Sequence, residues 1–149
     1  MKKIVLLLLS LVLFVSCANR DEQSSKSSDS KENKSSSSEA VLEAKEKLEE
    51  ETSLFNQSLP QQVDEITTCV SCKFDGKDVI YEYVVDESYA TISQLKNNKD
   101  VLRSNLKSIW DEYPAMKEMK KRLQTVGGKV VYKYSGSDTG EKMVINIEI

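Results

Sequence analysis

The segment 66–85, ITTCVSCKFDGKDVIYEYVV, contains two runs of alternating side chains joined by an Asp-Gly pair. Alternation with a period of two places successive side chains on opposite faces of a β-strand, so residues 66–74 and 79–85 are predicted to be strands. Asp75-Gly76 is typical of a two-residue type I′ turn, because both central positions of that turn need a positive φ. The segment is therefore predicted to form a β-hairpin.

The predicted turn also determines which residues of the two strands face each other. With Asp75-Gly76 as the loop, the expected cross-strand pairs are Phe74 with Lys77, Cys72 with Val79, Val70 with Tyr81, and Thr68 with Tyr83. Each strand then has one mainly apolar face, which in the second strand consists of Val79, Tyr81, Tyr83 and Val85. A hairpin with one apolar face needs a second layer to cover it.

Helical periodicity is found on both sides of this hairpin. Residues 39–56 are predicted to form a helix, because a capping box at Ser36 to Glu39 precedes apolar residues at helical spacing, namely Val41, Ala44, Leu48 and Phe55. Two further helical stripes follow the hairpin; the first comprises Leu95, Leu102, Leu106 and Ile109, and the second comprises Met116, Met119, Leu123 and Val126. Asp111 to Pro114 separates the two stripes, and Gly127-Gly128 ends the second helix.

A second pair of alternating runs ends the chain. Val130, Tyr132 and Tyr134 form one run, and Met143, Ile145, Ile147 and Ile149 form the other, with a Gly/Ser/Asp turn at residues 135–140 between them. The expected order is helix, β-hairpin, two helices, β-hairpin. We therefore predict an α+β domain over residues 39–149, with a four-stranded antiparallel sheet and helices on one face.

Cys69 and Cys72 have the C-x-x-C spacing of thiols that cycle between dithiol and disulfide. Redox pairs of this kind lie at the start of a helix, where backbone N–H groups lower the thiol pKa, whereas this pair lies within a predicted strand. Residues three apart on a strand point to opposite faces, so a bond between these two would need a β-bulge. Three interpretations follow: structural thiols, a disulfide within or between chains, and redox catalysis.

Two Tyr-x-Tyr pairs occur on the two predicted hairpins, Tyr81 with Tyr83 and Tyr132 with Tyr134. Side chains at alternate positions of a strand share one face of the sheet. Packing in the core, or half-buried against the helices, is the first interpretation. The alternative is a protein-binding surface formed by these four rings on the uncovered face of the sheet.

The composition argues against several classes of function. The chain of 149 residues has 21 Lys+Arg against 24 Asp+Glu and a formal charge of −3, so no basic excess predicts nucleic-acid binding. Histidine, the commonest metal ligand and general base, is absent. The sequence also has no Gly-rich phosphate loop and no Gly-x-Ser-x-Gly motif. We therefore expect no catalytic residues, no metal and no bound cofactor.

The first seventeen residues differ from the rest of the chain. Lys2 and Lys3 precede an apolar run from Ile4 to Val15, as in the charged and hydrophobic regions of a secretory signal. This run is too short to span a bilayer as a helix, which needs about 20 apolar residues. Leu13-Phe14-Val15-Ser16-Cys17 resembles the lipobox of bacterial lipoproteins, with Phe14 in place of the usual leucine.

The resemblance to lipoproteins implies cleavage between Ser16 and Cys17, removal of residues 1–16, a diacylglyceryl group on the Cys17 thiol and acylation of the new amino terminus. Such acyl chains would hold the protein on a membrane. Residues 17–38 would then be the lipidated N-terminus and a Ser-rich tether, too polar to bury a core. The expected location is the cell envelope, at the outer membrane if the cell is Gram-negative. Arg20-Asp21-Glu22 resembles a surface-export signal, so surface exposure is an open alternative.

These observations predict a lipid-anchored envelope protein whose domain binds another envelope protein without catalysis. One alternative is an inhibitor or immunity-type protein that blocks an enzyme, which an exposed hairpin fitted to a cleft would favour. The other is a thiol–disulfide protein that uses Cys69 and Cys72, which an exposed thiol of low pKa would favour.

Overall fold

The computed structural model describes residues 35–149. The predicted signal, the cleavage site at Ser16 and Cys17, and most of the predicted tether lie outside the described residues. The helices are α1 (Ser35–Asn56), α2 (Ile92–Asn97), α3 (Lys99–Glu112) and α4 (Lys117–Val126), with a short 3₁₀ helix η1 (Pro114–Met116). The strands are β1 (Gln61–Gln62), β2 (Thr67–Phe74), β3 (Val79–Val85), β4 (Lys129–Gly136) and β5 (Lys142–Glu148). None of the described helices is long and apolar enough to cross a membrane.

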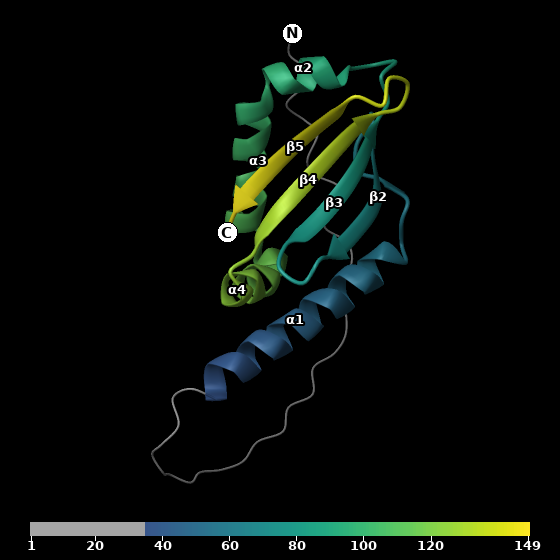
Figure 1. The fold of residues 1–149 in the computed structure, drawn as a ribbon. Coiled ribbons are helices and arrows are strands. Elements are labelled where there is room, and N and C mark those ends of the chain that lie inside the picture. Colours follow the sequence, from purple (N-terminus) through teal and green to yellow (C-terminus); the bar gives the residue numbers. More distant parts are fainter. Residues whose placement is uncertain (1–34) are drawn as a thin grey trace.

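The α+β class is confirmed, with the helices on one side of a sheet (Figure 1). The sheet itself differs from the prediction of four antiparallel strands, because it has five strands in the order β1-β2-β3-β4-β5. β3 and β4 pair in parallel, with Tyr81 opposite Tyr132 and Tyr83 opposite Tyr134. The reason is the connection between them. Because α2, α3 and α4 return the chain to the end of the sheet where β3 begins, β4 runs in the same direction as β3.

The helices match their predicted positions except at the start of α1 and at a break in the stripe after the hairpin. α1 already includes Ser35, four residues before the predicted start at residue 39, and it ends at Asn56 as predicted. The first stripe after the hairpin is divided into α2 and α3 at Asn98, which is the C-cap of one helix and the N-cap of the next. α4 ends at Gly127, whose φ of 64° is the left-handed conformation expected of a helix-ending glycine.

The predicted register of the first hairpin is wrong by two residues. Phe74 faces Val79 and Cys72 faces Tyr81, so the loop spans residues 75–78 rather than Asp75-Gly76 alone. The Asp75 carboxylate explains the longer loop, because its Oδ1 accepts hydrogen bonds from the backbone N–H of Lys77 (3.0 Å) and of Asp78 (2.8 Å). An aspartate side chain thus closes the turn in place of a type I′ backbone.

The core lies between the sheet and the helices. Leu48 of α1, Trp110 of α3 and Leu123 of α4 are buried against the covered face of the sheet, together with Ile145 and Ile147 of β5. The indole Nε1 of Trp110 donates a hydrogen bond of 2.7 Å to the hydroxyl of Tyr132, so this polar atom is satisfied inside the core. The other face of the sheet is not covered by the described helices (Figure 1).

Candidate functional site

A β-bulge in β2 brings the two thiols of the C-x-x-C pair to the same face of the sheet. The register of β2 against β3 shifts between Cys69 and Ser71. As a result Cys69 and Cys72 both point into the core, whereas Val70 is 41% exposed instead of lying on the apolar face as predicted. The bulge therefore removes the geometric objection that residues three apart on a strand face in opposite directions.

The environment of these thiols does not favour thiol chemistry. Cys69 and Cys72 are free cysteines that are only 1% and 3% exposed. Burial raises the pKa of Cys69 to about 11 and that of Cys72 to about 12, since a thiolate loses its hydration there. A redox-active thiol needs a lowered pKa and access to a partner, so the structure agrees with structural thiols among the three interpretations.

The four tyrosines form a stacked layer in the core. The Tyr81 and Tyr132 rings are 5.4 Å apart and nearly parallel, and the Tyr83 and Tyr134 rings are 5.2 Å apart. Each residue is at most 8% exposed, on the face of the sheet that the helices cover. The parallel pairing of β3 and β4 explains the stack, because it sets the two Tyr-x-Tyr pairs side by side. These rings pack the core and do not form a recognition surface on the uncovered face.

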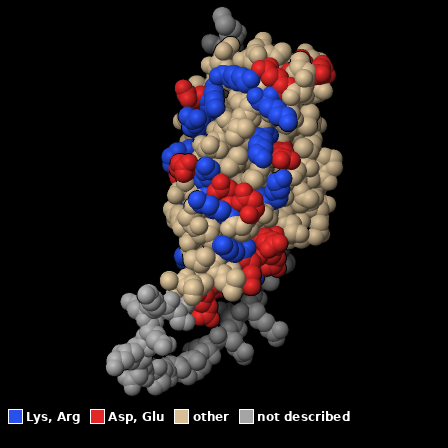
Figure 2. Space-filling model, in the orientation of Figure 1, with Lys and Arg blue, Asp and Glu red and all other residues tan. Residues whose placement is uncertain are grey.

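The uncovered face of the sheet carries mixed charge and a few apolar side chains. Glu82 of β3 lies between two lysines, at 3.7 Å from Lys73 of β2 and 3.9 Å from Lys133 of β4. Ile80 and Val131 are neighbours in the centre of this face and are each 8% exposed. Figure 2 shows acidic and basic side chains interspersed over one side of the molecule. Such a surface suits polar contacts with a protein rather than attraction by one sign of charge.

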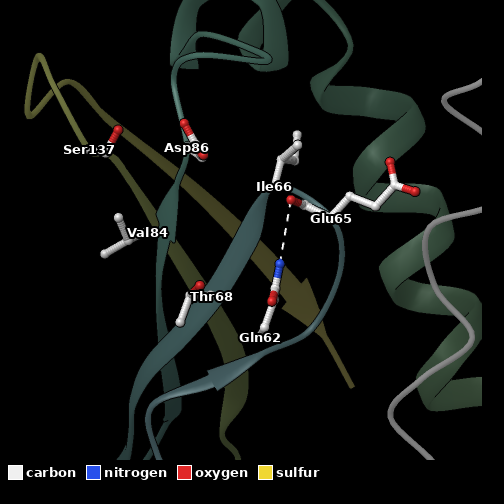
Figure 3. Close-up of a pocket in the computed structure, with 7 residues that line it drawn as sticks. All are labelled: Gln62, Glu65, Ile66, Thr68, Val84, Asp86 and Ser137. Carbon is white, nitrogen blue, oxygen red and sulfur yellow. Dashed lines mark hydrogen bonds between the residues drawn. The ribbon is translucent and has the colours of Figure 1, made fainter.

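One end of the uncovered face is hollowed. An open depression of about 400 Å³ lies there, and the residues that line it are Gln62, Glu65, Ile66, Thr68, Val84, Asp86 and Ser137 (Figure 3). Thr68 and Val84 are direct cross-strand partners in β2 and β3, so their side chains form its floor. The other residues come from β1 and from the loops at the ends of the strands. The depression is therefore assembled from three separate stretches of the chain, residues 62–68, residues 84–86 and Ser137.

The Asp86 carboxylate gives this depression its chemical character. Its Oδ1 accepts hydrogen bonds from the backbone N–H of Ser88 (3.0 Å) and from the Ser88 hydroxyl (2.6 Å). These bonds lower the pKa of Asp86, so the side chain is ionised at neutral pH. The Ser137 hydroxyl already accepts a hydrogen bond from the Glu87 N–H (3.2 Å) and donates one to Asp138 (3.0 Å), so the Asp86 carboxylate is the main acceptor that the depression offers to a cationic or amide side chain.

Sequence reasoning did not find this site. Its residues are separated by up to about one half of the chain, and each has an unremarkable neighbourhood in sequence. The one local signal is Asp86-x-Ser88 directly after a strand, which is typical of an Asx turn. Within residues 35–149, no group of three or more His, Cys, Asp or Glu side chains is placed to hold a metal ion.

No protein-family model matches the sequence, and no curated protein matches it either. The fold is similar to three solved structures. A candidate secreted protein of Pseudomonas aeruginosa superposes with a TM-score of 0.60 at 17% identity, over 73% of this chain and 92% of that one. EpsS, a pilotin of the Vibrio vulnificus type 2 secretion system, gives 0.54 at 10% identity, over 74% and 92%. AspS, a type II secretion system pilotin from Vibrio cholerae, gives 0.49 at 15% identity, over 72% and 93%. At these identities the likeness concerns the fold.

Proposed function

We propose that the chain is a lipid-anchored protein of the bacterial cell envelope whose domain binds another envelope protein and catalyses no reaction. The observation that carries this proposal is the fold shared with EpsS over 92% of that chain, since EpsS is by its description a pilotin of a secretion system. The buried thiols of Cys69 and Cys72 add support, because they leave the thiol–disulfide alternative without an accessible nucleophile.

The depression on the uncovered face is the surface that we assign to the partner. The covered face is filled by the core, whereas the depression is open and offers the ionised Asp86 as its main acceptor. A lysine, arginine or amide side chain of the partner would satisfy this acceptor. Apolar contact with Val84 on the floor would add buried area around that polar centre.

The inhibitor or immunity-type alternative needs an exposed hairpin tip that enters a cleft. The loop of the first hairpin is instead tied to β4, because Asp78 Oδ1 accepts a hydrogen bond of 3.1 Å from the backbone N–H of Lys129. This loop also approaches Gly128 so closely that an added Cβ there would lie 1.9 Å from the Lys77 carbonyl oxygen. These contacts fix the base of the loop, whereas its tip, Asp75 to Lys77, is exposed.

The anchor is proposed from the residues at the start of the chain. Cleavage between Ser16 and Cys17 and lipid on Cys17 would leave the tether leading into α1. The mature protein would then act close to the membrane that holds it, at the outer membrane in a Gram-negative cell, with surface exposure as the alternative orientation. Because α1 begins below α4 and reaches β2 only with its last turns, the tether would join the domain at the α4 end (Figure 1).

Partner binding is tested by site-specific photo-crosslinking of the full chain in intact cells. A photoreactive residue replaces Gln62, an exposed residue at the rim of the depression, and the matched control replaces Gln124, an exposed glutamine on α4. We expect one reproducible envelope protein crosslinked from position 62 and absent from position 124, and a smaller yield in the D86N background. The same adducts from both positions, or none from position 62, would contradict the proposed site.

A further inference from the structure

β5 forms an open edge of the sheet. Among residues 35–149 it pairs with β4 only, and Gly136 N–H donates a hydrogen bond of 2.9 Å to the Glu141 carbonyl at the start of this ladder. Hydrogen-bonded and non-hydrogen-bonded pairs alternate along antiparallel strands, so Met143, Ile145 and Ile147 direct their backbone groups to β4. The alternate residues of β5, which are Lys142, Val144, Asn146 and Glu148, direct theirs away from the sheet. No other segment of the described chain bonds to these outward groups.

The outward residues of β5 are also the exposed ones. Their side chains lie on the uncovered face, and Val144 is 43% exposed. The strand is seven residues long and contains no proline and no bulge. The features that normally prevent strand addition at an edge are therefore restricted to one charge at each end, Lys142 and Glu148.

We propose that β5 pairs antiparallel with β5 of a second copy of this chain. A two-fold axis at Ile145 places Lys142 opposite Glu148 of the other copy, and Val144 opposite Asn146 of the other copy. Both ends of the joint then carry an opposite-charge pair, so the strand is complementary to itself in charge. The same register pairs only outward residues with outward residues, which is the condition for a continuous hydrogen-bonded ladder.

The proposed joint and Gln62 are at opposite edges of the sheet. β5 is at the opposite edge of the sheet from β1 and β2, and α1 packs on β2 (Figure 1). Gln62 in β1 is therefore at the edge away from the joint, whereas α1 begins below α4, on the side of the sheet where β5 ends. The inference goes beyond the proposed function and does not rest on it, because pairing through β5 leaves the partner site free.

Disulfide trapping in intact cells tests the register. In the V144C/N146C variant of the full chain, each new cysteine would lie opposite the other one of the second copy, with the Cα atoms about 5.5 Å apart. Disulfides span Cα separations of about 4.4–6.8 Å, so a mild oxidant should give a covalent dimer. In the matched single variant K142C the two cysteines would be about 20 Å apart, so no dimer is expected. Equal dimer from both variants, or none from V144C/N146C, would overturn the proposal.

Charge reversal provides the second arm. Adding Lys142→Glu to the V144C/N146C variant sets two acidic pairs across the joint, and we expect the dimer yield to fall about fivefold or more. Adding Glu148→Lys as well restores opposite charges and should restore the yield. An equal dimer yield with and without these two substitutions would overturn the register. Failure here would leave the adduct from position 62 unaffected, and failure of that adduct would leave the dimer unaffected, so the two proposals are distinguishable.

Discussion

At one edge of the sheet, β2 is closed by other parts of the chain, and at the other edge β5 is open. β1 pairs with β2 at Gln61 and Gln62, and the Val63 N–H donates a hydrogen bond of 2.9 Å to the Thr67 carbonyl. Beyond the bulge, the Asn56 side chain accepts a hydrogen bond of 3.0 Å from the Cys72 N–H. β5 has no such contacts from the described residues on its outer side.

The two edges of this sheet therefore differ in how many of their outward backbone groups have partners among the described residues. An unpaired edge is a template for another strand, and proteins usually block it with bulges, charges or covering segments. β2 has a bulge, a short partner strand and a side-chain cap from α1, whereas β5 has only its terminal charges, Lys142 and Glu148. The blocked edge shelters two thiols, and the open edge presents a strand that is complementary to itself.

The largest expected effect concerns the thiols behind the blocked edge. A rise in pKa from 9.0 to about 11 for Cys69 and to about 12 for Cys72 lowers the thiolate fraction about a hundredfold and a thousandfold. Alkylation at pH 8, followed by peptide mapping of each cysteine, should therefore be at least about a hundredfold slower in the native chain than in the unfolded chain. Equal rates in the two states would show that the blocked edge does not protect the thiols.

At the open edge, the contribution of β5 to the free energy of unfolding should come mainly from its buried side chains, because β5 has a hydrogen-bonded strand on one side only among the described residues. Ile145 is fully buried on the covered face of β5, so Ile145→Ala should lower the free energy of unfolding by about 2–5 kcal/mol. Ile145→Val is the matched control, with an expected loss of about 0.5–1.5 kcal/mol. Denaturant unfolding measures both. A loss below 1 kcal/mol for the alanine variant would mean that β5 contributes little to the fold.

At the blocked edge, Asn56 is the residue to change. Asn56→Ala leaves the Cys72 N–H without its acceptor. The free energy of unfolding should therefore fall by about 1–2 kcal/mol, and Cys72 should be alkylated faster. Gln57→Ala changes an exposed neighbour without that bond and serves as control in both measurements. If the two variants behave alike, the cap on β2 has no effect on the edge.

A pH effect is expected at the turn that leads into β5. The Glu87 carboxylate accepts hydrogen bonds from the backbone N–H of Thr139 (2.7 Å) and of Asp138 (3.0 Å), which lower its pKa below 4.5. A carboxylate with a lowered folded pKa stabilises the fold above its unfolded pKa, and this contribution is lost as the pH falls through the folded value. The Thr139 amide resonance should therefore titrate below pH 4.5 in the native chain. The same titration in Glu87→Gln would rule out this assignment.

The smallest effect on stability is expected for Val144. Val144→Thr keeps a β-branched side chain at an exposed position of β5, so unfolding should change by less than about 0.5 kcal/mol. A larger change measured in dilute solution, where copies do not pair, would show that this residue supports the single domain. Val144 would then contribute to the stability of the single domain as well as to contact with a second copy.

Much of the local structure could be predicted from periodicity. The alternation at residues 79–85 marks a strand whose odd positions are buried, and Gly127 ends a helix as expected. Periodicity does not specify the partner of a strand, however, so β3 and β4 were expected to belong to separate antiparallel hairpins and instead pair in parallel. β1 has no pattern to detect, since it consists of Gln61 and Gln62.

The candidate site was less predictable than the fold. The C-x-x-C pair drew attention because of its spacing, but only the bulge at Val70 determines that both thiols face the core. Alternation correctly predicts that the tyrosines share one face of the sheet. They are buried because the helices cover that face. The depression at Asp86 has only the weak local signal of Asp86-x-Ser88, because strand ends distant in the chain form it.

The sequence by itself determined the α+β class, the order of most elements and the expectation of a lipid anchor at Cys17, because these depend on local spacing and on one short motif. Tertiary structure decided the parallel pairing of β3 and β4, the burial of the thiols and tyrosines, the depression, and the contrast between the two edges. These features arise from contacts between distant segments, whose free energy depends on the packed arrangement and not on the neighbours of each residue.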